Sequence, residues 1–152
     1  MKLLLVEDDR EIQEMLGDYL RTEAYEVVCA SNGRDACRLF DEGGIGLVLL
    51  DLMLPGLTGE EFIAQMRQKK TMPIIVLSAK AGLEDKVNVL RLGADDFIPK
   101  PFDNLEVLAR VEAQLRRVED VLAQAVDEAR KGGFSLSELQ ELLTLLYQGD
   151  EL

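Results

Sequence analysis

Five polar residues that can do chemistry follow short apolar runs, where the chain changes abruptly in character. They are Glu7 and Asp8, Asp51, Ser78 and Lys100. Carboxylates that are held together repel one another unless a cation lies between them. Oxygen ligands suit Mg²⁺ or Mn²⁺, and the absence of histidine from the chain argues against zinc. The set therefore predicts a magnesium site.

A carboxylate beside Mg²⁺ can attack a phosphoryl group and form an acyl phosphate. Asp51 follows the central apolar run, so we expect it to be the nucleophile. The metal, the Lys100 ammonium and the Ser78 hydroxyl would each stabilise charge on one phosphoryl oxygen. Taken singly, an acid after a strand often only caps the next helix, as we expect of Asp9 for a helix that begins near Arg10.

The elements that must position these residues are predicted by the hydrophobic periodicity. Apolar runs at 3–6, 26–30, 47–50, 74–77 and 97–98 indicate five strands, separated by stretches with helical spacing. Five strand–helix repeats favour an α/β fold, with a doubly wound, five-stranded parallel sheet of flavodoxin-like order 2-1-3-4-5. Ligands of such sheets bind at the carboxyl ends of the strands, where all five polar residues would converge.

The charge of the chain excludes several classes of function. Among 152 residues, 29 acids face 17 bases and the net charge is −12, so we expect no direct contact with nucleic acid. Without histidine the chain has no Ser-His-Asp triad. It carries no apolar run that could span a membrane and no pattern typical of a signal peptide, and Cys29 and Cys37 are expected to be reduced thiols. These features predict a cytoplasmic protein.

Four segments of the sequence, at 3–9, 49–59, 74–79 and 93–102, resemble the signature segments of bacterial response-regulator receiver domains of the CheY-like fold. The resemblance covers residues 1–118. It implies that Asp51 accepts a phosphoryl group from a phosphohistidine of a sensor histidine kinase. It also implies that Asp8 binds Mg²⁺ directly, that Glu7 acts mainly through a water molecule and that Met53 supplies its backbone carbonyl.

The same resemblance implies a switch. Ser78 and Lys100 would contact the phosphoryl oxygens, and the Lys100–Pro101 peptide bond is expected to be cis. Phosphorylation would draw the Ser78 hydroxyl inward, and Phe97 would rotate into the space that is released. Such a domain is a phosphoacceptor and not a metabolic enzyme, with only slow self-catalysed gain and loss of phosphate. The face formed by the fourth helix, the fifth strand and the fifth helix would be remodelled, and it would then bind a downstream protein or a second copy.

The resemblance extends to the OmpR/PhoB type, whose members form homodimers through that face by apolar contacts and ion pairs. The alternative is that the charged residues on this face are solvated and contribute almost nothing singly. At the pair of Arg91 with Glu112, a base precedes an acid, whereas the usual order in this family is acid then base. This exchange of charges disfavours pairing with an ordinary relative. The expected pairs are Lys86 with Glu106, Asp96 with Arg110, and Arg91 with Glu112.

Residues 119–152 are expected to form a helical extension in place of a winged-helix DNA-binding domain. Apolar residues from Val111 to Ala129 keep a 4-3-4-3-4 spacing, which predicts that the fifth helix continues to Gly132. Ser135 and Glu138 form a capping box before a final helix. The extension is interpreted as a dimerisation element that forms a four-helix bundle, with three alternatives. It binds another protein, it begins a longer DNA-binding regulator, or it covers the receiver's own surface.

One alternative from another class is a Mg²⁺-dependent phosphohydrolase of similar topology. Such enzymes usually carry a second aspartate two residues after the nucleophile, as a general acid. That position is Met53 here, which disfavours rapid turnover.

Overall fold

A computed structural model describes residues 1–68 and 72–149, which contain five strands and six helices. In chain order these are β1 (Lys2–Val6), α1 (Arg10–Thr22), β2 (Glu26–Ala30), α2 (Gly33–Asp41), β3 (Ile45–Asp51), α3 (Gly59–Arg67), β4 (Ile74–Ser78), α4 (Leu83–Leu92), β5 (Asp96–Pro99), α5 (Asn104–Lys131) and α6 (Leu136–Gln148).

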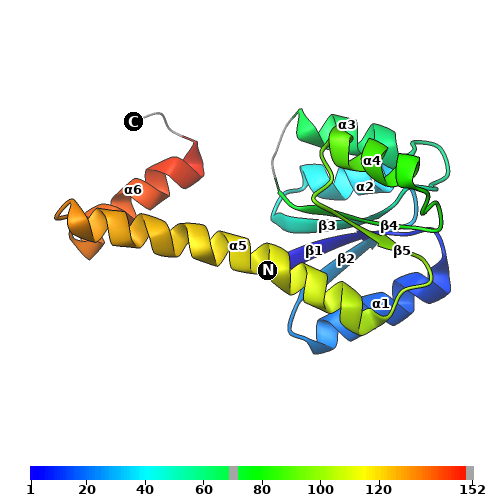
Figure 1. The fold of residues 1–152 in the computed structure, drawn as a ribbon, viewed down its shortest axis with the longest axis horizontal. Coiled ribbons are helices and arrows are strands. Elements are labelled where there is room, and N and C mark those ends of the chain that lie inside the picture. The colour runs from blue at the N-terminus through cyan, green and yellow to red at the C-terminus, as the bar shows by residue number, and fades with distance from the viewer. Residues whose placement is uncertain (69–71, 150–152) are drawn as a thin grey trace. The chain divides into compact units, whose positions relative to one another are not determined.

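All five strands join one parallel sheet in the order β2-β1-β3-β4-β5, which confirms the predicted α/β class and topology. Figure 1 shows α2, α3 and α4 on one face of the sheet, and α1 with the first turns of α5 on the other. The strands at the centre are covered on both faces, so every side chain of the segments at 3–6 and 47–50 is inaccessible to water. This arrangement places the carboxyl ends of β1, β3, β4 and β5 along one edge.

Four of the strands extend beyond the apolar runs, and two of them, β3 and β4, end on a polar residue of the predicted site. Asp51 is the last residue of β3 and Ser78 is the last residue of β4, because each still takes part in the parallel ladder. Periodicity marks where a strand is covered by helices, whereas the ladder continues wherever the backbone keeps its partner. The two polar side chains are therefore held by strands and not by loops.

The polar residues that begin the helices are the expected caps. Asp9 accepts hydrogen bonds from the backbone N–H groups of Glu11 and Ile12 at 3.0 and 3.2 Å, and α1 begins at Arg10 as predicted. Ser135 and Glu138 form the predicted capping box of α6. These local bonds fix where the helices begin, independently of the core.

The chain divides into two compact units, Met1–Glu112 and Ala113–Leu152, with the division inside α5. The boundary after Val118 stays a prediction, and residues 150–152 of the predicted extension lie outside the described residues. Within the second unit the fifth helix continues to Lys131, and α6 has no buried residue. Among the described residues, no helix has the length and apolar character needed to cross a membrane.

Candidate functional site

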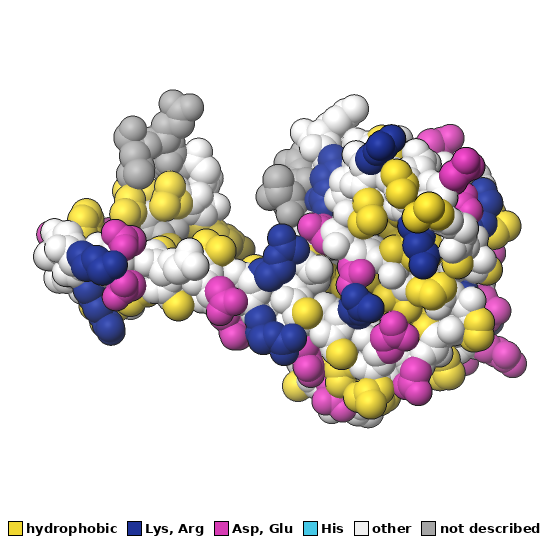
Figure 2. Space-filling model, in the orientation of Figure 1, with side chains coloured by type: hydrophobic (Ala, Val, Ile, Leu, Met, Phe, Trp, Pro, Cys, Tyr) yellow, Lys and Arg dark blue, Asp and Glu magenta, His cyan; other side chains and the backbone are white. Residues whose placement is uncertain are grey.

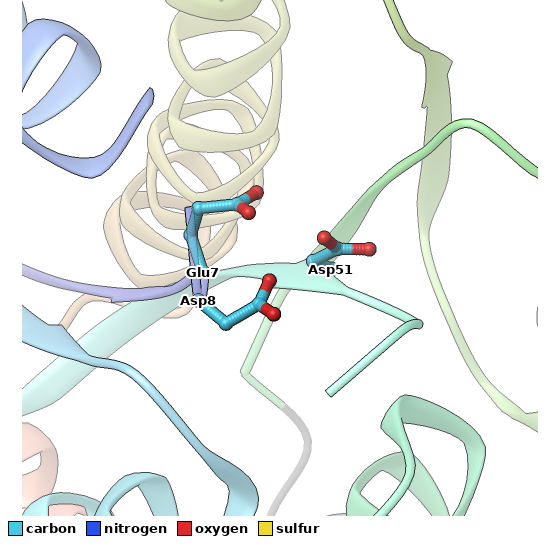
Figure 3. Close-up of side chains that lie close together, drawn as sticks. All are labelled: Glu7, Asp8 and Asp51. Carbon is cyan, nitrogen blue, oxygen red and sulfur yellow. The ribbon is translucent and has the colours of Figure 1, made fainter. Parts of the chain in front are cut away.

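Three carboxylates meet where β1 and β3 end. Glu7 and Asp8 follow β1, Asp51 ends β3, and one oxygen atom of each lies within 4.8 Å of the others (Figure 3). Glu7 and Asp51 are buried, with 1% and 5% of their surface exposed, whereas Asp8 is exposed. The structure thus brings together the acids that the sequence placed at two separate strand ends.

Lys100 provides the cation that these acids need. Its Nζ atom donates hydrogen bonds to Oε2 of Glu7 at 2.7 Å and to Oδ2 of Asp51 at 2.9 Å. The lysine side chain is 15% exposed, so water weakens these ion pairs little. Lys100 follows β5, and its peptide bond to Pro101 is cis.

Backbone groups hold the carboxylates in place. The N–H of Asp9 donates to Oε1 of Glu7, and the N–H of Met53 donates to Oδ1 of Asp51, both at 3.0 Å. The second bond turns the chain directly after β3, so Met53 lies beside the acids. Each oxygen of both carboxylates therefore has one hydrogen-bond donor, which orients the groups before any ligand arrives.

The electrostatics of the site follow from burial. Burial raises the pKa of Glu7, and the charge of Asp51 adds to this shift, although the hydrogen bonds from Lys100 and from the Asp9 backbone oppose it. Burial also disfavours the charged form of Lys100, but hydrogen bonds to Glu7 and Asp51 outweigh this effect and raise its pKa. The ammonium is thus firmly protonated, as a group that neutralises anions must be.

A close approach of the backbone shapes the loop beside Asp51. A methyl group on Gly59, the first residue of α3, would lie 2.5 Å from Cα of Leu52 and 2.9 Å from the carbonyl oxygen of Asp51. A side chain does not fit at that distance, so Gly59 lets α3 begin directly against the end of β3. Thr58 caps the helix through a 3.2 Å bond to the N–H of Glu61.

Ser78 ends the strand next to Asp51, with its side chain inaccessible to water. Its Oγ accepts a hydrogen bond from the N–H of Lys80 at 3.1 Å, and its carbonyl oxygen accepts one from the N–H of Lys100 at 2.9 Å. Phe97, in β5, is half-buried and packs against the main core. The ammonium of Lys86, in α4, lies 5.7 Å from the centre of the Phe97 ring.

The donor set fits Mg²⁺. Three carboxylates and a backbone carbonyl such as that of Met53 are the hard oxygen ligands that this ion prefers, and neither a thiol nor an imidazole belongs to the acidic cluster. Asp8 is the most accessible of the three acids and adds negative charge that Lys100 does not reach. A divalent cation here would offset that excess.

A model of the response regulator receiver domain family matches residues 3–112 of this chain. The chain belongs to this family. The match includes every residue of the acidic cluster as well as Ser78 and Lys100, and it confirms the resemblance noted in the sequence. The chain is thus a receiver domain of a two-component response regulator, with further residues after it.

The receiver resembles individual proteins over most of its length. It is 46% identical over 121 residues to YcbL, an uncharacterized transcriptional regulatory protein of Bacillus subtilis; the match covers 80% of this chain and 54% of that protein. The chain therefore spans about half the length of this curated relative.

Solved receiver structures have the same fold. The BeF₃-activated N-terminal receiver domain of Klebsiella pneumoniae RstA is 32% identical, with a TM-score of 0.73 over 76% of this chain and 99% of that one. A putative response regulator from Chloroflexus aurantiacus is 34% identical, with a TM-score of 0.71 over 76% and 97% of the two chains. These matches confirm the predicted CheY-like fold.

The six charged residues expected at a dimer face lie on α4, β5 and α5. Within one chain, Arg110 contacts Oδ2 of Asp96 at 3.3 Å and Oε1 of Glu106 at 3.8 Å. Asp96 and Arg110, which were expected to pair between two protomers, thus already form an ion pair within one protomer. Arg91 and Glu112 are exposed. Pairing between two copies stays a prediction.

Two features beside the site were not anticipated from the sequence. Nε2 of Gln13 donates to the carbonyl oxygen of Glu7 at 3.0 Å and so braces the end of β1 from α1. An apolar pocket of about 380 Å³ opens next to Lys100 and is lined by Ile12, Met15, Ala79, Pro101 and Phe102 as well as the lysine itself. The sequence signal for the pocket was weak, because an apolar residue on a helix normally indicates core.

Proposed function

We propose that the chain is a phosphoacceptor switch in which Asp51 receives a phosphoryl group from a phosphohistidine of a sensor histidine kinase. The observation that carries the proposal is the Lys100 ammonium, which contacts both Glu7 and Asp51 within an acidic cluster. Such a cation is well placed to neutralise an incoming phosphoryl group as the Asp51 oxygen attacks it.

The transfer is an in-line displacement. An oxygen of Asp51 forms a bond to phosphorus, the bond from phosphorus to the imidazole nitrogen of the donor breaks, and the imidazole leaves with the electron pair. Asp8, Asp51 and the Met53 carbonyl would hold Mg²⁺ directly, and Glu7 would hold it mainly through a water molecule; the ion would supply charge stabilisation at the phosphoryl oxygens. Lys100 neutralises a second oxygen, and the Ser78 hydroxyl donates to a third after leaving the Lys80 N–H.

The phosphodonor protein is expected to cover the apolar pocket beside Lys100. The pocket exposes mainly apolar surface, and Met15 is 50% exposed at its rim. An apolar contact this close to Asp51 would exclude water from the transfer. We place the whole event in the cytoplasm, where kinase domains of two-component systems meet their receivers.

Phosphorylation then alters the face formed by α4, β5 and α5. When Ser78 moves toward the phosphoryl group, Phe97 turns inward and leaves the Lys86 ammonium that now lies over its ring. This change promotes homodimerisation of the OmpR/PhoB type or binding of a downstream target. Arg91→Glu is expected to weaken phosphorylation-dependent dimerisation, and Arg91→Glu with Glu112→Arg to restore it; an unchanged dimerisation constant in the single variant would refute the pairing.

The central test is phosphorylation by acetyl phosphate and Mg²⁺, followed as a mobility shift in a Phos-tag gel. The wild type and Asp9→Asn should shift, because Asp9 caps α1 and an asparagine caps equally well. Asp51→Asn should not shift. A shift in Asp51→Asn would refute the choice of nucleophile.

A phosphohydrolase of similar topology is the competing function. It would release phosphate steadily from simple phosphomonoesters, whereas a switch would form one stable acyl phosphate per chain. Met53 occupies the position where such enzymes carry their general acid, and it offers no proton. Steady release of phosphate at many turnovers per minute would therefore refute the phosphoacceptor switch and favour the phosphohydrolase.

The output of this receiver is a separate question, because the chain spans about half of its curated relative. That relative is named as a transcriptional regulator, and control of transcription is the output we propose for a full regulator of this kind. Residues 119–152 carry 8 acids and 2 bases, so the extension itself is not expected to contact DNA.

A further inference from the structure

The second compact unit exposes an unusual share of apolar side chains. Of the fifteen large hydrophobic side chains exposed in the described residues, nine lie between Val118 and Tyr147. Figure 2 shows such side chains on the surfaces of α5 and α6. An exposed apolar surface of this extent favours packing against a partner, since most of the stability of helices in proteins comes from packing of their apolar face.

The apolar residues of α5 form a seam with the spacing of a coiled coil. Val118, Leu122, Ala125 and Ala129 are separated by four, three and four positions. Val118 is 51% exposed and Leu122 is 45% exposed, so this part of the seam has no cover within its own unit. A 3.5-residue period is the pattern by which two helices pack along a shared seam, and small residues such as alanine let them approach closely.

The residues that flank the seam favour one orientation. Val121 and Val126 flank the seam at heptad positions g and e, counted with Leu122 at position a. In a parallel pair of α5 helices, position g meets the position e that lies five residues later on the other copy, so Val121 meets Val126. In an antiparallel pair centred on the seam, Val126 lies opposite Glu119, and Val121 lies opposite Glu128. Val121 is 64% exposed, and the parallel pair is the one that buries it against another apolar side chain.

The net charge of the unit opposes a second copy only weakly. Residues 113–149 carry six acids and four bases, a net charge of −2. On the outer face of α5, Lys131 forms ion pairs with Asp127 and Glu128 of the same helix at 2.9 and 2.8 Å. The seam residues themselves carry no charge, so a basic partner protein would gain little electrostatic binding energy from them.

We propose that residues 113–149 associate with the same residues of a second copy, with the two α5 helices parallel along the seam from Val118 to Ala129. The apolar side of α6, from Leu136 to Leu146, then closes over the pair. The association does not depend on Asp51 or on phosphate. The seam lies further along α5 than Glu112, the last residue assigned to the switching face, and a failure of either proposal leaves the other standing.

The test uses the full chain with Asp51→Asn, so that phosphorylation cannot contribute, and measures mass by sedimentation equilibrium. The parent should be a dimer. Leu122→Asp should raise the dissociation constant by at least about tenfold, because a charge enters the seam. Ala123→Asp is the matched control: it adds the same charge one position away, on the exposed outer face, and should leave the constant unchanged.

The orientation is tested by cross-linking in a background of Cys29→Ser and Cys37→Ser. Val118→Cys and Ala129→Cys should each form a disulfide with themselves across a parallel pair. An antiparallel pair would form disulfides only when the two variants are mixed, which would overturn the proposed orientation. A monomeric parent, or equal weakening by Leu122→Asp and Ala123→Asp, would overturn the seam; circular dichroism of each variant verifies that its helices are kept.

Discussion

Asp8→Asn measures how strongly the three carboxylates of the site repel one another. Coulomb's law at the 4.8 Å limit between their oxygens gives about 0.9 kcal/mol per pair at a dielectric constant of about 80, and about 3.5 kcal/mol at about 20. Asp8 is exposed, so the lower value applies. It faces two acids, and Lys100 offsets about one of them, which leaves a net repulsion of about 1 kcal/mol.

Without metal, the variant should therefore be more stable than the wild type by about 1 kcal/mol in urea unfolding with EDTA. Saturating MgCl₂ should reverse the order, because the wild type gains binding free energy that the variant has lost with its most accessible ligand. Glu26→Gln, which removes an exposed charge from β2, controls for the change in net charge. A less stable Asp8→Asn in EDTA would show that the cluster is not repulsive, and the case for a metal would fail with it.

Two further predictions concern the loop beside Asp51 and the thiols. Gly59→Ala should lower the free energy of unfolding by about 1–3 kcal/mol, because its methyl group meets backbone at 2.5 Å. Gly82→Ala, whose nearest obstacle is a flexible carboxylate at 3.2 Å, should cost much less, and equal losses in urea unfolding would contradict the steric argument. Burial raises the pKa of the Cys29 thiol, although Arg21 opposes the shift. In Cys37→Ser, alkylation of Cys29 at mildly alkaline pH should thus be slower than in the unfolded chain; the same rate in both states would refute this.

Much of the fold could be predicted because its local and global signals agree. The sheet order followed from five apolar runs, each short enough to be a strand and each followed by a helical pattern. The starts of α1 and α6 followed from Asp9 and Ser135, whose caps act over three residues. The ends of β3 and β4 were missed by one residue, because Asp51 and Ser78 belong to the ladder but not to the apolar run.

The contacts within the site were less accessible to sequence reasoning. The rule that ligands bind at strand ends placed Glu7 beside Asp51, but nothing in the sequence indicates that Lys100 reaches both. Likewise Arg110 was assigned a partner in another protomer, whereas Asp96 and Glu106 lie within its reach in the same chain. A long side chain has many rotamers, and its choice of partner depends on distances that only the folded chain defines.

Lys100 also provides a positive charge that is part of the domain and that balances the buried acids without a bound metal ion. If Mg²⁺ alone balanced the buried acids, each fall in free metal inside the cell would threaten the fold. Here the ammonium stays bound to Glu7 and Asp51, and the remaining repulsion of about 1 kcal/mol is small beside the ~5–15 kcal/mol that hold a domain folded. Under the proposed function, changes in cellular magnesium would therefore alter how much of the receiver is ready to react, and would leave the amount of folded receiver almost constant.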